Sequence, residues 1–195
     1  MRLAVGVRSA VANSEHPHAL WLAFGVGLAV AVWFIAPSLA WFDSGELAAA
    51  AVQLGVPHPT GFPGFCLAGH SASRLPFGSA ALRVHLLGAG CAALALALWL
   101  RRGLPAAADW PARAALLAVA ALLPLAVPAL ALHVRATELY APVWLIAALT
   151  VALGVAVPAP QRLLGLAALA GVGAGINVEA ALVAGLAWLK TAAAL

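Results

Sequence analysis

Charged side chains are scarce in this sequence. Of its 195 residues 8% are charged, six of them acidic and ten basic, while 65% are hydrophobic. Water-soluble domains carry about 25% charged residues, so a soluble fold is not expected. The basic residues are scattered and form no stripe, which argues against a nucleic-acid partner.

Cysteine is nearly absent as well. Cys66 and Cys91 are the only two, and their separation fits neither a zinc ligand pair nor a redox pair. The sequence also lacks a glycine-rich nucleotide-binding loop and a cluster of His and Cys. It therefore predicts no metal-ligand cluster and no bound cofactor, and leaves open whether a divalent metal assists.

Long apolar runs make up much of the sequence. Crossing ~30 Å of hydrocarbon takes ~20 helical residues, and runs of about this length recur along the chain. The predicted fold class is an all-α membrane protein, a bundle of about five transmembrane helices. The expected spans are about 19–36, 81–100, 112–132, 139–157 and 163–189. The last could be two segments, broken at Gly171, Gly173 and Gly175.

The connection over residues 37–80 is rich in Pro and Gly. We expect it to be the first outer loop, with a short helix at about 44–54 that Gly55 ends. Residues 1–18 are expected to form a cytoplasmic tail and residues 19–195 a single transmembrane domain. A signal peptide cleaved after Ala40 is conceivable, but the long polar N-terminal region favours a retained span.

The basic residues show a modest positive-inside bias. With a cytoplasmic N-terminus, residues 37–80 and 133–138 share the outer face. The residues expected inside are Arg2, Arg8, Arg101, Arg102, Arg113 and Arg162, and those expected outside are Arg74, Arg83, Arg135 and Lys190. We expect a multi-pass protein of a bacterial inner membrane.

The stretch FDSGELAAAAVQLGVPHPTGFPG holds two of the six acidic residues, Asp43 and Glu46. In one interpretation they form a capping box, in which Asp caps a helix and Glu reaches back to the cap amide. In the other they are functional, because carboxylates beside a membrane span are costly and commonly serve chemistry. The loop that follows holds His58 on a path fixed by Pro and Gly. Both interpretations stay open on local grounds.

The same stretch resembles the signature of a family of protein O-mannosyltransferase-like membrane proteins. These belong to the GT-C superfamily of glycosyltransferases, which use lipid-phosphate-linked sugars. The family pattern is D-S-G-E, a small-residue helix ending in L-G-V, then H-P-P-G-Y-P. This chain departs from it at Thr60 and Phe62.

Further motifs are similar in the same order. RVHLL at residues 83–87 resembles the family's R-V-N-L-L, and ELYA at residues 138–141 resembles E-V-Y-A. Residues 171–177 resemble G-L-x-L-G-N-H, although Val178 stands where the family has His. The resemblance covers about residues 33–180.

The resemblance implies transfer of a mannose-type sugar from a polyprenyl-phosphate donor to a hydroxyl of a protein or glycan at the outer face. Asp43 matches the position of the catalytic base, and Glu46 would orient it or contact the acceptor. The implied substrate-binding residues are His58, Arg83, Arg135, Glu138, Tyr140 and Asn177. No cofactor beyond the lipid-linked donor is implied.

Two other functions remain open. Family members usually have more spans, so the chain could be a truncated, non-catalytic bundle or subunit that assembles with further membrane subunits. A small transporter is the other alternative. It is less expected, because transporters place their acidic residues near the middle of the membrane rather than in a loop.

Overall fold

The computed structural model describes residues 17–38, 43–103 and 138–194, together with the single residues 112, 115 and 119. These parts of the chain are helical and contain no strand. Their helices are α2 (Pro17–Phe34), α3 (Ser44–Gln53), α4 (Pro63–Ser73), α5 (Ala80–Gly103), α8 (Tyr140–Ala156), α9 (Ala159–Ile176) and α10 (Val178–Ala192). The all-α prediction is confirmed for these residues.

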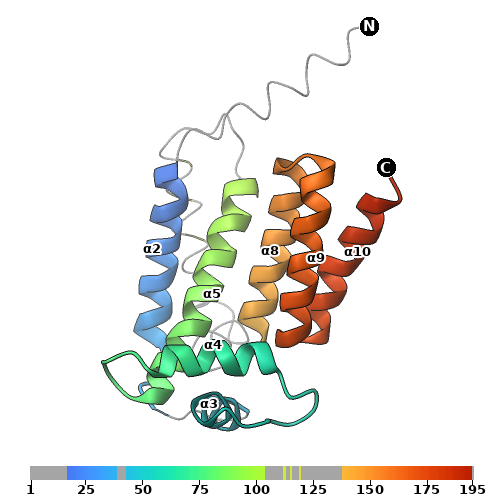
Figure 1. Cartoon of the computed structure of the whole chain (residues 1–195). Coiled ribbons are helices and arrows are strands. Elements are labelled where there is room, and N and C mark those ends of the chain that lie inside the picture. The colour runs from blue at the N-terminus through green and yellow to red at the C-terminus, as the bar shows by residue number, and fades with distance from the viewer. Residues whose placement is uncertain are drawn as a thin grey trace, which may run out of the picture.

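Five of the helices lie side by side and two lie across one end of the resulting bundle (Figure 1). Helix α2 packs on α5, α5 on α8, and α8 on both α9 and α10. Helix α4 crosses the end at which α5 and α8 begin, and α3 lies beyond it. We call this the capped end of the bundle, and the other the open end.

Helices α2 and α5 meet along a seam of small side chains. A spacing of four residues keeps such residues on one helix face. Ala23 packs with Ala97 and Ala31 with Ala89, and a Cβ at Gly27 would lie 3.5 Å from Ala93 between them. Small residues let two backbones approach closely, as is typical of helix pairs in membranes.

One described helix is long and apolar enough to cross a membrane, over Ala80–Arg101 in α5. The apolar stretches of α2 and α8, Leu20–Phe34 and Tyr140–Gly154, are shorter. This fits membrane insertion, and the number of spans stays a prediction. The expected span at 112–132 and the cleavage position at Ala40 lie outside the described residues, apart from three helical positions.

The expected first outer loop contains a second helix, α4, that the sequence analysis missed. Pro63 is its first residue, where a missing N–H costs nothing because that group has no helical partner. Phe65, Cys66 and Gly69 form its buried face. Pro63, in the Pro- and Gly-rich stretch expected to be a loop, therefore starts a helix.

Helix α3 ends one residue earlier than expected. Leu54, and not a glycine, takes the left-handed conformation, with φ of 53°. The N–H of Gly55 donates to the carbonyl of Ala50 at 2.8 Å and that of Leu54 to Ala51 at 3.5 Å. These two bonds satisfy two of the last four carbonyls of the helix. Gly55 therefore follows the terminating residue.

The run expected at 163–189 is two helices, and its break is at Asn177 rather than at the glycines. Oδ1 of Asn177 accepts the N–H of Glu179 at 3.1 Å and so caps α10. Gly173 instead lies at a close approach of α9 and α10, since a Cβ there would be 2.7 Å from the carbonyl carbon of Ala180. A residue without a side chain permits this contact.

The hairpin of α9 and α10 changes the position of Lys190. Because α10 runs back toward the open end, its last turn carries Lys190 to that end. Arg162, in the first turn of α9, and Arg101, near the end of α5, lie there as well. The expectation that Lys190 lies on the face of residues 37–80 was wrong, since it treated 163–189 as one crossing.

A buried apolar cluster holds the capped end together. It joins α3, the loop after it, α4, α5 and the residue before α8. Its members are Leu47, Ala50, Ala51, Phe62, Phe65, Cys66, Val84 and Leu139. A Cβ at Gly69 would lie 2.7 Å from the Cβ of Ala51, so α3 and α4 are in close contact. The cluster fixes the surface on which the candidate site lies.

Candidate functional site

Asp43 directly precedes α3 at the capped end, and its side chain is exposed. A capping side chain needs a non-helical backbone at this position. Asp43 instead has helical angles, φ −69° and ψ −11°, and its carboxylate makes no capping hydrogen bond. The capping-box prediction was wrong, and the carboxylate is accessible to a reactant.

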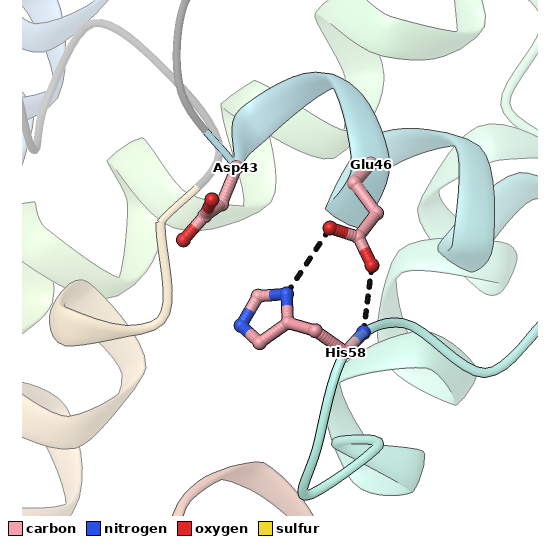
Figure 2. A group of neighbouring side chains, drawn as sticks. All are labelled: Asp43, Glu46 and His58. Atoms are coloured by element: carbon pink, nitrogen blue, oxygen red, sulfur yellow. Dashed lines mark hydrogen bonds and ion pairs between the residues drawn. The ribbon is translucent and has the colours of Figure 1, made fainter.

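Glu46 binds His58 instead of the start of its own helix (Figure 2). One carboxylate oxygen, Oε1, accepts the backbone N–H of His58 at 2.6 Å, and Oε2 lies 3.1 Å from Nδ1 of the ring. These bonds, the ring bond first and the backbone bond second, lower the pKa of the Glu46 carboxyl. A carboxylate accepting from Nδ1 keeps that nitrogen protonated and fixes the orientation of the ring. The ring lies between Glu46 and Asp43.

The loop after α3 holds His58 from its other side. The carbonyl of His58 accepts the N–H of Gly61 at 3.0 Å. The ring of His58 meets the buried ring of Phe62 edge-on, with 5.3 Å between the ring centroids. Gly61 has φ of +85°, a conformation that glycine adopts without strain. His58 is thus held by backbone, carboxylate and aromatic contacts together.

Glu138 is distant in the sequence, yet it lies close enough to Asp43 for their charges to interact. It stands two residues before α8 and is half-buried. Burial, and after it the negative charge of Asp43, raises the pKa of the Glu138 carboxyl. The expectation that Asp43 and Glu138 share one face of the molecule is confirmed.

Arg83 lies in the first turn of α5 with its side chain half-buried. Its Nη1 donates to the carbonyl of Leu75. Its Nε–H is buried and finds no acceptor among the described residues. Buried donors are nearly always bonded, so an unbonded one is an exception.

The remaining predicted binding residues differ in their placement. Tyr140 opens α8 at the capped end and is exposed. Asn177 lies at the same end, where its Oδ1 is engaged in capping α10. Arg135 lies outside the described residues.

Sequence reasoning found no metal ligands, yet the structure brings a mixed set together. One ligand atom each from Asp43, Glu46 and His58 lies within 4.8 Å of the other two. Carboxylate oxygen and imidazole nitrogen together suit a divalent transition-metal ion. Both oxygens of Glu46 already accept bonds from His58, so an ion that used Glu46 would compete with one of them.

A second histidine contact was also missed. Nδ1 of His70 lies 3.0 Å from the carbonyl of Val52, and Nε of Arg74 lies 3.3 Å from Nε2 of His70. A carbonyl only accepts, so Nδ1 carries the proton and Nε2 accepts from Arg74. The contact ties α4 to the last turn of α3. The spacing of four between His70 and Arg74 was visible in the sequence, whereas the partner Val52 was not.

Comparison with known proteins places the chain in a family. The sequence profile described as "Protein O-mannosyl-transferase TMEM260 N-terminal domain" matches residues 43–188, from Asp43 through most of α10. The chain belongs to this family. The matched range therefore includes every described residue of the candidate site. No solved structure matches the chain.

A curated relative shares part of the sequence. Protein O-mannosyl-transferase TMEM260 of Mus musculus is 55% identical over 51 residues, which make up 26% of this chain and 7% of that protein. The matched part is a small share of the relative. What that protein does therefore bears on this chain only as a proposal.

The bond between Glu46 and His58 leads to a prediction on pH and stability. A carboxyl whose pKa is lowered in the fold adds stability above its unfolded value, and this is lost as pH falls through the folded value. We expect wild type to be more stable than Glu46→Gln at neutral pH, with the difference shrinking below the ordinary value of 4.5. Thermal unfolding of the purified protein as a function of pH measures this.

The matched control is Glu179→Gln, which removes another exposed acid near the capped end. Its difference from wild type should not show this dependence. A difference between wild type and Glu46→Gln that stays constant down to pH 3 would contradict the predicted role of the Glu46 charge.

Proposed function

We propose that this chain is a membrane glycosyltransferase of GT-C type that transfers a mannose-type sugar from a polyprenyl-phosphate donor to a hydroxyl of a protein or glycan. The observation that carries the proposal is the accessible carboxylate of Asp43 beside the ordered ring of His58, at the first position of the family match. Family membership supports a glycosyltransferase-like role. The geometry adds the residue roles that follow.

Asp43 is the proposed general base. As the acceptor oxygen attacks the anomeric carbon, its proton passes to the Asp43 carboxylate, and the bond between that carbon and the phosphate oxygen breaks. The electron pair of that bond leaves on the polyprenyl phosphate. Asp43 suits this role because its side chain is exposed and makes no capping bond.

Glu46 is proposed to act through His58. The carboxylate holds the ring through Nδ1, so the other ring nitrogen, Nε2, is directed away from Glu46. From there Nε2 serves as a contact for the acceptor or the phosphate. Glu46 is in this sense a positioning residue for His58, which refines the expectation that it orients Asp43.

The departing phosphate needs hydrogen-bond donors where its charge develops. Arg83 is proposed to supply one, since its side chain is half-buried at the capped end and guanidinium geometry suits phosphate. Arg135 and Tyr140 are proposed as further contacts. Glu138, whose carboxyl is half-buried beside the charge of Asp43, is proposed to contact the acceptor.

The proposed placement is a multi-pass arrangement in a bacterial inner membrane with a cytoplasmic N-terminus. The apolar helix Ala80–Arg101 supports membrane insertion. Arg101, Arg162 and Lys190 at the open end support a cytoplasmic position for that end, because cytoplasmic ends of spans are enriched in Lys and Arg. The capped end, with Asp43, then faces outward.

A transfer assay tests the function. Membranes containing the full chain are given radiolabelled polyprenyl-phosphate mannose and a peptide rich in Ser and Thr. We expect label on the peptide, and none when nucleotide-linked mannose replaces the lipid donor in washed membranes. Membranes from cells without the chain are the control.

The same assay addresses the alternative. Absence of transfer from the lipid donor, in membranes where the chain is present and folded, would contradict the catalytic proposal. Co-purification of such an inactive chain with other membrane proteins would support the non-catalytic subunit.

A further inference from the structure

Three large apolar side chains are exposed along α4 and the turn into α5, one on the helix and two after it. Leu67 is 61% exposed, and Leu75 and Phe77 are each 47% exposed. Arg74 is exposed beside them. We call these four residues the α4 edge. Single exposed apolar side chains are normal on a protein surface, whereas three within eleven residues of chain suggest a surface that is covered in the working state.

The position of the α4 edge suggests what covers it. Helix α4 lies across the bundle, between α3 and the ends of the upright helices (Figure 1). Phe77 precedes the apolar span Ala80–Arg101 by three residues. If α5 crosses the membrane, the α4 edge therefore lies level with the boundary between acyl chains and lipid headgroups. A helix lying flat at this depth buries its apolar side in the boundary.

The charges of the α4 edge favour an anionic lipid surface. Between Pro63 and Ser79 there is no acidic residue, and the ionisable groups are those of Cys66, His70 and Arg74. Nε and Nη2 of Arg74 both lie 3.3 Å from Nε2 of His70, which holds the guanidinium against α4 while the side chain stays exposed. Each basic residue near an anionic membrane surface contributes to the attraction.

We propose that the α4 edge lies in the headgroup layer of an anionic membrane, with Leu67, Leu75 and Phe77 at the acyl boundary and Arg74 on lipid phosphates. This rests on the membrane placement proposed above. It also sets the depth of the site. Helix α3, beyond α4, then stands about one helix diameter, ~10 Å, above the boundary. Asp43 therefore faces water, where a soluble acceptor meets a phosphate that rises from the lipid.

Spin labels on the full chain test the depth of the α4 edge. In a background with Cys66→Ala and Cys91→Ala, single cysteines replace Leu67, Leu75 or Phe77, and each carries a nitroxide. Two reference positions are Val56, 87% exposed just after α3, and Gly90, where added atoms would meet nothing within 4 Å in the middle of the apolar span. Relaxation by oxygen and by a water-soluble nickel chelate reports depth in reconstituted vesicles.

In vesicles of phosphatidylethanolamine and phosphatidylglycerol we expect relaxation by oxygen to exceed relaxation by the chelate at the three α4-edge positions. At Val56, relaxation by the chelate should exceed relaxation by oxygen. If the three labels behave like Val56 while Gly90 is shielded from the chelate, the α4-edge proposal fails and the membrane placement stands. If Gly90 is also open to the chelate, both fail. Labels shielded from both reagents would mean that a protein covers the edge, which also overturns the proposal.

The charge of Arg74 is tested separately. We expect Arg74→Gln to shift the Phe77 label toward water in anionic vesicles but not in vesicles of phosphatidylcholine alone. Arg101→Gln, which removes an exposed cation near the open end, is the matched control and should leave the label in place. An Arg74→Gln variant with an unchanged label in anionic vesicles would overturn the assignment of Arg74 to lipid phosphates.

Discussion

Replacing Asp43 with asparagine is expected to reduce sugar transfer by about 10²- to 10⁴-fold, the usual contribution of a general base. Asparagine keeps the size of the side chain but cannot take the acceptor proton. The fold should be unaffected, because the Asp43 carboxylate makes no capping bond to α3. The measurement is the initial rate of mannose transfer per amount of folded chain, with the lipid donor at several concentrations.

The control for this result is Glu179→Gln. Glu179 is an exposed acid in the first turn of α10, and it does not belong to the group formed by Asp43, Glu46 and His58. We expect its transfer rate to equal that of wild type. Unchanged transfer by Asp43→Asn, or equal losses in both variants, would remove Asp43 from the reaction.

Replacing Gly173 with alanine is expected to have the largest effect on stability. A Cβ at this position would lie 2.7 Å from the carbonyl carbon of Ala180 and 2.8 Å from the nitrogen of Ala181. Both are backbone atoms, so no side-chain rotation relieves the clash and α10 itself must move. Overpacking of this kind costs about 1–3 kcal/mol. The shift in denaturation midpoint in detergent micelles measures it.

Gly171 provides a matched control in the same helix. It is exposed, and a Cβ there would meet nothing within 4 Å. Gly171→Ala should therefore be neutral or stabilising by roughly 0.5–1 kcal/mol, the ordinary gain of alanine over glycine in a helix. Equal midpoints for Gly171→Ala and Gly173→Ala would show that α9 and α10 do not approach as closely as the structure has them.

The helices with strong apolar patterns could be predicted from the sequence. The predicted ranges 81–100 and 139–157 correspond to α5 (Ala80–Gly103) and α8 (Tyr140–Ala156). The predictions that failed concerned single residues that can play two structural roles. Pro63 was expected to lie in a loop and instead starts a helix, and Gly173 was expected to break a helix and instead permits a close contact.

The sequence indicated which residues form the site but not the contacts between them. The motif pointed to Asp43, Glu46 and His58, but local grounds left a capping box and a functional role both open. The outcome depended on the path of the loop, which brings the N–H of His58, twelve residues away, to the carboxylate of Glu46. Local sequence preferences do not determine a contact between residues twelve positions apart. The approach of Glu138 to Asp43 likewise depends on how α8 packs against α5.

The two bonds of Glu46 have different requirements. The bond from Oε1 goes to a backbone N–H, which nearly every residue at position 58 would offer, whereas the bond from Oε2 requires a ring nitrogen. The backbone bond to Oε1 therefore does not depend on which side chain stands at position 58. A substitution at position 58 would thus keep the backbone bond to Oε1 and lose the ring contacts to Glu46 and Phe62.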